Sequence, residues 1–300
     1  MFDRILVPLD GSKAAEVVFP YVTEIAATFD SKIFLTHVSE SSDPAAINEY
    51  TSYLKGTTLQ MKSQLESRGA HHEAGLQTKI LTGNPAVEIL KYAREIDCGL
   101  IAMASRGLSS EGPWTLGNIA AKILRASSFP VLLVRKQAEA SKLIEKKLIQ
   151  KILVPLDGSK LGEAAIPLVT ELSNKTGAEI VLFRVVEPIS AFVGPTGEMA
   201  WSLVNTYEKN ARYPVLAYLE RTKESLKNTI PVISTATGEG LPADQIVDYA
   251  QANTIDLIAM STHGRSGIGR WVFGSVTEKV LHAGEQPVLV VRPKGGAAVK

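Results

Sequence analysis

Residues 4–13 read RILVPLDGSK and residues 151–160 read KILVPLDGSK, so the two stretches are identical at nine of ten positions. A second matching pair lies further along, where residues 130–135 read PVLLVR and residues 287–292 read PVLVVR. The offset between the copies is 151 − 4 = 147 at the first pair and 287 − 130 = 157 at the second. The chain is therefore a duplicated domain with a slightly longer second copy, and its period is far too long for a solenoid repeat.

The repeated stretch also indicates the fold class. A short apolar run that ends in Asp-Gly-Ser is typical of a buried strand followed by a turn. In each copy, further apolar runs alternate with segments of helical spacing, which predicts βαβ crossovers and a mostly parallel sheet. We expect two tandem α/β domains of Rossmann-like fold, each a five-stranded parallel sheet with helices on both faces: domain 1 over residues 1–138, a linker over 139–149, domain 2 over 150–294 and a tail over 295–300.

Individual elements can be assigned from the same patterns. Asn84 followed by Pro85 favours a helix start, because Asn caps a helix and Pro fits its first turn, whereas Leu241 before Pro242 cannot cap. The predicted strands are 5–9, 32–38, 78–81, 100–103 and 131–134 in the first copy, and 152–156, 179–186, 232–236, 257–260 and 288–291 in the second; the predicted first-copy helices include 14–29, 47–67 and 118–126.

Composition excludes several classes of function. The chain has 32 Lys+Arg against 31 Asp+Glu, a formal net charge of +1, which argues against bulk attraction to nucleic acid or to an anionic membrane. Cys98 is the single cysteine, so an intrachain disulfide and a Cys-rich metal site are excluded. No apolar run approaches the roughly 18 residues of a membrane span, and the N-terminus lacks a signal-peptide pattern. We expect a cytoplasmic protein.

Well-known catalytic motifs are absent from the sequence. There is no Gly-x-x-x-x-Gly-Lys-Ser/Thr phosphate loop and no Gly-x-Gly-x-x-Gly after the first strand, which disfavours a Walker-type ATPase and a dinucleotide site. There is also no Gly-x-Ser-x-Gly elbow and no His-Glu-x-x-His zinc motif. The sequence therefore gives no catalytic residue and no metal ligand set, and an enzymatic activity would be at most a weak ATPase.

The loop after the fourth strand of the second copy suits a phosphate. It reads Ser261-Thr262-His263-Gly264, then nine residues, then Gly274-Ser275-Val276 and a helical stretch. Glycines let backbone N–H groups approach a ligand, and a helix start offers unpaired N–H groups and a positive dipole end. A flexible loop with a glycine turn is the alternative interpretation.

The first copy keeps the spacing and changes the chemistry. It reads Ala104-Ser105-Arg106-Gly107, then nine residues, then Gly117-Asn118-Ile119. Arg106 replaces the histidine and Asn118 replaces the serine, so phosphate binding is better supported in the second copy. Asp10 and Asp157 end the first strand of each copy, where ligands of open α/β sheets bind. Their carboxylates could contact a ligand, or each could bond its own backbone in the Asp-Gly-Ser turn.

These motifs together resemble the universal stress protein family, and the chain is similar to its tandem-domain members over nearly its whole length. The resemblance implies a fold related to other adenine-nucleotide-binding folds, and ATP with Mg²⁺ as the ligand. It implies that Asp157 and the backbone of Val185 hold adenine, that Met260, His263 and Gly264 line the ribose and phosphates, and that Gly274, Ser275 and Val276 bind the phosphates. The implied binding residues are Pro155, Asp157, Val185, Met260, Ser261, His263, Gly264, Gly274, Ser275 and Val276 in the second copy, and Asp10, Val38, Met103, Arg106, Gly107, Gly117, Asn118 and Ile119 in the first.

Three functions follow as hypotheses. The first is an ATP-binding stress-response protein with an unknown protein partner, in which nucleotide occupancy is a regulatory signal. The second is slow ATP hydrolysis or nucleotidyl transfer, for which His263 is the only candidate base in the loop. The third is a ligand-free scaffold, because the family's loop usually begins with glycine whereas Ala104 and Ser261 hold those places here. The resemblance also implies pairing through the last strands, which could occur within this chain, and two chains could still form a homodimer.

Four other features carry weaker interpretations. The Lys- and Glu-rich connector, 136–150, is interpreted as a partly helical, solvated segment. The segment 188–207 holds most of the extra length of the second copy and could be a lid, a partner surface or a surface excursion. His71-His72-Glu73 is interpreted as surface, and Cys98 as a packing thiol.

Overall fold

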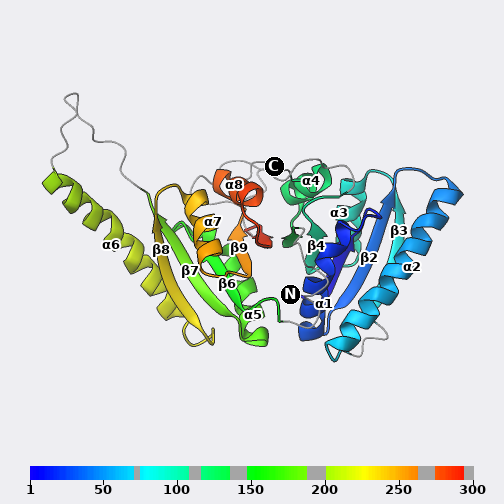
Figure 1. Ribbon diagram of the computed structural model, residues 1–300, viewed down its shortest axis with the longest axis horizontal. Coiled ribbons are helices and arrows are strands. Elements are labelled where there is room, and N and C mark those ends of the chain that lie inside the picture. Colours follow the sequence, from blue (N-terminus) through cyan, green and yellow to red (C-terminus); the bar gives the residue numbers. More distant parts are fainter. Residues whose placement is uncertain (71–74, 108–115, 136–146, 188–200, 263–273, 294–300) are drawn as a thin grey trace, which may run out of the picture.

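The computed structural model describes residues 1–70, 75–107, 116–135, 147–187, 201–262 and 274–293, and within 201–211 the backbone alone (Figure 1). Most of the connector, the loops 108–115 and 263–273, the pair His71-His72 with Glu73, residues 188–200 and the tail from 294 lie outside this description.

The two halves contain the same elements in the same order. The first half runs β1 (Arg4–Pro8), η1 (Ala15–Val18), α1 (Phe19–Phe29), β2 (Lys32–Ser39), α2 (Pro44–Ser67), β3 (Leu76–Thr82), α3 (Pro85–Glu95), β4 (Leu100–Ala104), α4 (Asn118–Ala126) and β5 (Val131–Val134). The second runs β6 (Lys151–Pro155), η3 (Gly162–Ala165), α5 (Ile166–Thr176), β7 (Glu179–Val186), α6 (Trp201–Leu226), β8 (Ile233–Glu239), α7 (Pro242–Ala252), β9 (Leu257–Ser261), α8 (Ser275–Ala283) and β10 (Val288–Val291).

Helix starts follow the capping residues. The side chain of Asn84 accepts a hydrogen bond from the Val87 N–H at 3.4 Å, while Leu241 provides no side-chain cap, as predicted. The predicted helix over 14–29 is instead a 3₁₀ turn followed by an α-helix. Pro20 lies in the first turn of α1, where its missing N–H costs nothing, so the α-helix begins there. Helix α2 begins before the predicted residue 47 because Asp43 caps it.

The ten strands of the described residues form one sheet in the order β3-β2-β1-β4-β5-β10-β9-β6-β7-β8. Strands are parallel within each half, and the halves join where β5 and β10 pair antiparallel, with Leu132 opposite Leu289. The prediction of two five-stranded parallel α/β units is confirmed, and so is pairing of the last strands within one chain. Because the strand order reverses between β1 and β4, and between β6 and β9, each half has a switch point where ligands of open α/β sheets bind.

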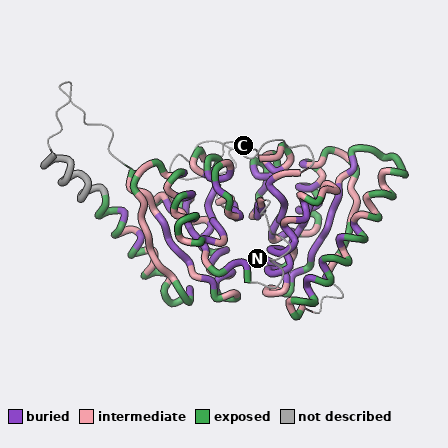
Figure 2. Tube along the Cα trace, in the orientation of Figure 1, coloured by how far each residue is buried: buried purple, intermediate pink, exposed green. Residues whose placement is uncertain are grey.

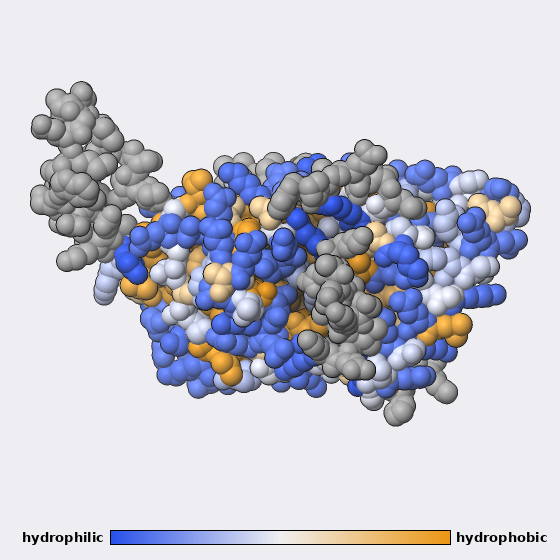
Figure 3. Space-filling model, in the orientation of Figure 1, coloured by the Kyte–Doolittle hydropathy of each residue, from blue (hydrophilic) through white to orange (hydrophobic). Residues whose placement is uncertain are grey.

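The central strands are buried on both faces, whereas the edge strands β3 and β8 are only partly buried. Ile5 and Val7 of β1 belong to a core under α1, α2, α5 and α6, and Leu6 between them belongs to a core under α3, α4, α7 and α8. Figure 2 shows the central strands buried and the outward faces of the helices exposed. In Figure 3 most described residues on one face are hydrophilic, with separate hydrophobic areas between them.

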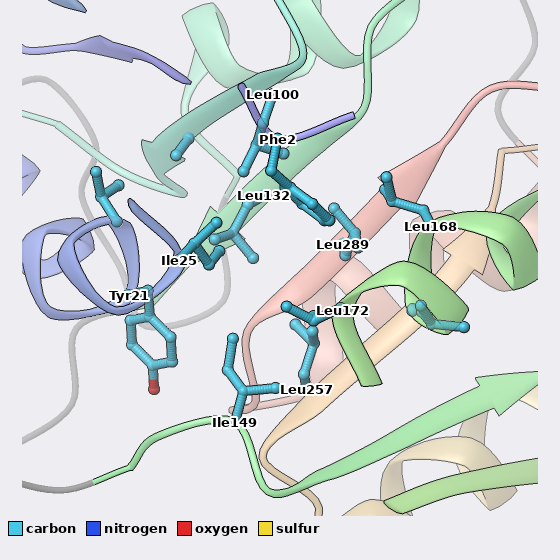
Figure 4. Close-up of a cluster of buried hydrophobic side chains, with 14 of the residues drawn as sticks. Phe2, Tyr21, Ile25, Leu100, Leu132, Ile149, Leu168, Leu172, Leu257 and Leu289 are labelled. Carbon is cyan, nitrogen blue, oxygen red and sulfur yellow. The ribbon is translucent and has the colours of Figure 1, made fainter. Parts of the chain in front are cut away.

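One core is shared by the two halves. In Figure 4, Phe2 and Leu132 of the first half lie in one cluster with Leu168, Leu172 and Leu289 of the second. These side chains are almost fully buried. Burial of apolar surface across the junction therefore helps to hold the halves together.

Two carboxylates fix the described end of the connector. Glu24 in α1, which is 5% exposed, accepts hydrogen bonds from the N–H groups of Leu148 at 2.7 Å and Ile149 at 3.0 Å. Asp256 of the second half accepts from Gln150 N–H at 3.0 Å and Lys151 N–H at 2.9 Å. In the described residues, no helix has the length and hydropathy that a membrane span needs.

Candidate functional site

A cavity of about 420 Å³, which we call the second pocket, opens at the carboxyl ends of β6 and β9. Its size lies within the range of about 300–1,000 Å³ that is usual for ligand pockets. It is lined by Pro155, Leu156, Asp157, Gly162, Phe183, Arg184, Val185, Glu187, Pro242, Ile246, Met260, Ser261, Gly274, Ser275, Val276 and Thr277.

The second pocket brings together residues from four separate parts of the sequence. Pro155 ends β6 and Asp157 follows it, Val185 lies in β7, Met260 and Ser261 end β9, and residues 274–276 begin α8. All the residues predicted for this site that the structure describes line the cavity. The remaining two, His263 and Gly264, lie outside the described residues.

Helix α8 points its N-terminus into this pocket. Gly274 provides no side-chain cap, and its own N–H donates to the carbonyl oxygen of Thr262 at 3.0 Å. A Cβ on Gly274 would lie 3.2 Å from that oxygen, so a larger residue would push the loop away from the helix. Thr277 Oγ1 donates to the carbonyl oxygen of Ser261 at 3.0 Å and ties the helix to β9. The first N–H groups of such a helix, with the positive end of its dipole, favour an anion.

Asp10 and Asp157 fit both interpretations that the sequence left open, because each forms the local turn and also lines a pocket. Asp157 Oδ1 accepts from the Ser159 N–H at 2.9 Å and the Ser159 hydroxyl at 2.7 Å, so the local turn is formed. Asp10 does the same with Ser12, at 2.9 and 2.6 Å. Both carboxylates also line their pockets. The turn therefore holds each carboxylate at a pocket wall.

A corresponding cavity of about 200 Å³, the first pocket, lies at the carboxyl ends of β1 and β4. Every first-half residue predicted for the site lines it: Asp10, Val38, Met103, Arg106, Gly107, Gly117, Asn118 and Ile119. Gly107 packs directly against the Asp10 carboxylate, and a Cβ there would overlap Asp10 Oδ2. This close approach provides a structural reason for glycine at position 107.

Each pocket also contains a basic residue that the sequence analysis missed. His37 in β2 lines the first pocket, and its ring stacks on Tyr50 with centroids 3.5 Å apart. Its Nδ1 lies 2.9 Å from the carbonyl oxygen of Leu9 and so carries the proton of the neutral ring. Burial lowers the pKa of His37, although the Leu9 hydrogen bond and Asp10 act in the opposite direction.

Arg184 takes the place of His37 in the second pocket. Its guanidinium lies 4.9 Å from the ring centroid of Tyr218, whose hydroxyl donates to Glu163 at 2.9 Å. Burial and the Glu163 carboxylate raise the pKa of Tyr218. Both basic residues immediately precede a predicted site valine, at positions 38 and 185, and this was the available sequence signal.

Two other sequence interpretations can be compared with the structure. Cys98 is buried and its thiol donates to the carbonyl oxygen of Leu100, as suits a packing role. Burial raises the pKa of Cys98 to about 11. Over the described ranges, His, Cys, Asp and Glu side chains form no group of three that could hold a metal ion.

Comparison with known proteins gives consistent results. The sequence profile of the Universal stress protein family matches residues 1–135 and 148–292. A universal stress protein of Mycolicibacterium smegmatis is 22% identical over 305 residues, covering 97% of both chains, and one from Methanocaldococcus jannaschii is 33% identical over 147 residues, covering 49% of this chain and 84% of its own. The crystal structure of a universal stress protein from Archaeoglobus fulgidus superimposes with a TM-score of 0.71 at 21% identity, covering 97% of this chain and 99% of the other.

Proposed function

The chain belongs to the universal stress protein family, and from this premise we propose that its second pocket binds ATP, with Mg²⁺, as a regulatory signal. One observation carries the proposal. A cavity of about 420 Å³ at the switch point of the second half is lined by every described residue that the sequence analysis selected for adenine, ribose and phosphate.

The pocket offers a suitable contact for each part of the nucleotide. Apolar walls from Ile246 and Met260 suit a purine ring, and the Asp157 carboxylate can accept a hydrogen bond from an adenine amino group or a ribose hydroxyl. The N-terminus of α8, with the hydroxyl of Ser275, suits the phosphates. In the proposed complex the anionic end of the ligand would lie against the helix and its aromatic end against the sheet.

The position of α8 supports a signalling role. Its first turn lines the second pocket, and the carbonyl oxygen of Leu281 in its last turn accepts a hydrogen bond from Arg135 of the first half. A ligand that favours one position of α8 therefore acts on an element that both halves hold. A ligand shifts a conformational equilibrium only through different affinities for its states, and α8 is the element whose position would differ.

Titration calorimetry with ATP and Mg²⁺ tests the proposal on full-length protein stripped of bound nucleotide. We expect one ATP per chain in the wild type. Binding should disappear in Gly274→Trp, whose side chain would fill the helix end of the second pocket, and should persist in the matched variant Gly117→Trp. Absence of ATP binding to the wild type at millimolar concentration, or retention of binding by a folded Gly274→Trp protein, would overturn it.

A further inference from the structure

We propose that the first pocket is selective for an adenine nucleoside monophosphate and discriminates against the triphosphate, so that the two halves recognise different adenine ligands. This inference rests on the proposed function, because it assumes that the adenine end of both pockets works in the same way. It concerns the phosphate end, where the two pockets differ.

The adenine end is retained in both halves. Asp10, Val38 and Met103 of the first pocket correspond to Asp157, Val185 and Met260 of the second, at offsets of 147, 147 and 157. The apolar wall is also retained, since Ile89 corresponds to Ile246 at an offset of 157. A ligand with the same base therefore meets the same chemistry in either pocket.

The space available differs about twofold. The first pocket has about 200 Å³ and the second about 420 Å³. Pockets for drug-sized ligands usually have about 300–1,000 Å³, so the first pocket falls below this range and the second falls within it. The smaller cavity favours a ligand with a shorter phosphate chain.

Larger residues at the phosphate end accompany this difference. Helix α4, at the first pocket, starts with Asn118 and Ile119. Helix α8, at the second pocket, starts with the smaller residues Ser275 and Val276. Phe183 and Arg184 of the second pocket are larger than the residues at the corresponding positions of the first. Both pack against other side chains: the ring centroids of Phe183 and Tyr249 are 4.7 Å apart, and the Arg184 guanidinium lies on the Tyr218 ring.

Arg106 gives the first pocket a cation for a single phosphate. It lines the cavity beside Gly117 and Asn118 at the start of α4. Burial lowers the pKa of the neighbouring Arg135, and the positive charge of Arg106 lowers it further, so the two guanidinium groups repel each other. An anion of low charge at Arg106 would relieve this repulsion.

The test uses full-length Gly274→Trp protein, in which the second pocket is blocked, and calorimetric titration with AMP, adenosine and ATP. We expect about one AMP per chain, with ATP bound at least tenfold more weakly than AMP. Arg106→Gln in the same background should weaken AMP at least tenfold and leave adenosine unchanged. ATP binding as tight as AMP binding, no AMP binding, or equal loss of AMP and adenosine in Arg106→Gln would each overturn the inference.

An exchange of residues gives an independent measurement in the same background. The double variant Asn118→Ser, Ile119→Val should bind ATP at least fivefold more tightly than its parent, with AMP changed by less than twofold. Unchanged ATP affinity in a variant with the parental melting temperature would contradict the argument from size. Failure of the proposed function gives a different result, because wild-type protein and Gly117→Trp would then not bind ATP.

Discussion

The guanidinium of Arg135, just after β5, donates a hydrogen bond to the carbonyl oxygen of Leu281 in the last turn of α8. The same contact occurs in the opposite direction, since Arg292, just after β10, donates to the carbonyl oxygens of Arg125 and Ser127 at 3.3 Å each, at the end of α4. Each half thus places a cation at the C-terminus of a helix in the other half, where it interacts favourably with the helix dipole and the unpaired carbonyls.

Replacing Arg135 should destabilise the protein. Arg135→Met keeps much of the aliphatic stem and removes the hydrogen bond and the charge, so we expect a loss of about 2 kcal/mol in the free energy of unfolding. Urea denaturation at neutral pH measures it. The control is Arg212→Met: Arg212 forms an ion pair with Glu239 at 3.0 Å in which both side chains are more than half exposed, so its loss should cost less than about 1 kcal/mol. Equal effects would argue against a special role for Arg135.

Replacing Glu24, whose carboxylate holds the connector, should destabilise the protein more than replacing Arg135. Glu24→Gln leaves an amide facing the N–H groups of Leu148 and Ile149 and removes the charge partner of Arg68, 3.4 Å away. We expect a loss of about 3 kcal/mol, as when a buried ion pair loses one partner. The matched control is Glu171→Gln, which loses the 2.8 Å ion pair with the N-terminal amino group across the same junction. Glu171 is one-third exposed, so its effect should stay below about 1 kcal/mol.

The buried histidine should make stability depend on pH. Because the pKa of His37 is below its usual value in the fold, the unfolded chain binds more protons as the pH falls below about 6.5. The contribution of His37 to stability is therefore present above this pH and is lost as the pH falls toward the folded-state pKa. Urea denaturation at pH 7.5 and 5.5 should show a larger drop for the wild type than for His37→Asn. A larger drop for the variant would contradict the sign.

The cysteine should be unreactive in the folded protein. Burial raises the pKa of Cys98 to about 11, so the thiolate is scarce at pH 8, and the side chain is buried as well. Labelling with a chromogenic disulfide reagent at pH 8 should be slow in native protein and complete within the mixing time in concentrated guanidinium chloride. Rapid stoichiometric labelling of protein that keeps its native circular dichroism would show the thiol to be accessible.

Much of the fold was predictable because the signals are local. Strand β7 and helix α4 have the predicted bounds, and the cap at Asn84 depends on residues within one turn. The predicted helix 14–29 failed at its start because the apolar spacing continues through the 3₁₀ turn, whereas the hydrogen bonding changes near Pro20. Hydrophobic periodicity does not distinguish the two kinds of turn.

The site was partly predictable for the same reason. The glycine spacing and the strand ends selected residues that do meet in one cavity in each half. His37 and Arg184 were not predicted because their neighbours in space, Tyr50 and Tyr218, lie on other elements of the chain, helices α2 and α6. The contact of Glu24 with Leu148 spans 124 residues, and a charge inside an amphipathic helix gives no sign of such a partner.

The antiparallel pairing of β5 with β10 has a further consequence for how the protein behaves on dilution. When strands of separate chains pair, the fraction of paired strands falls as the protein concentration falls. Here Leu132 and Leu289 lie on one chain, so each strand meets the other at an effective concentration set by the intervening chain, typically millimolar for short flexible linkers. The paired halves should therefore remain together at any copy number in the cell. Either half can also accumulate substitutions without having to match a second copy of itself.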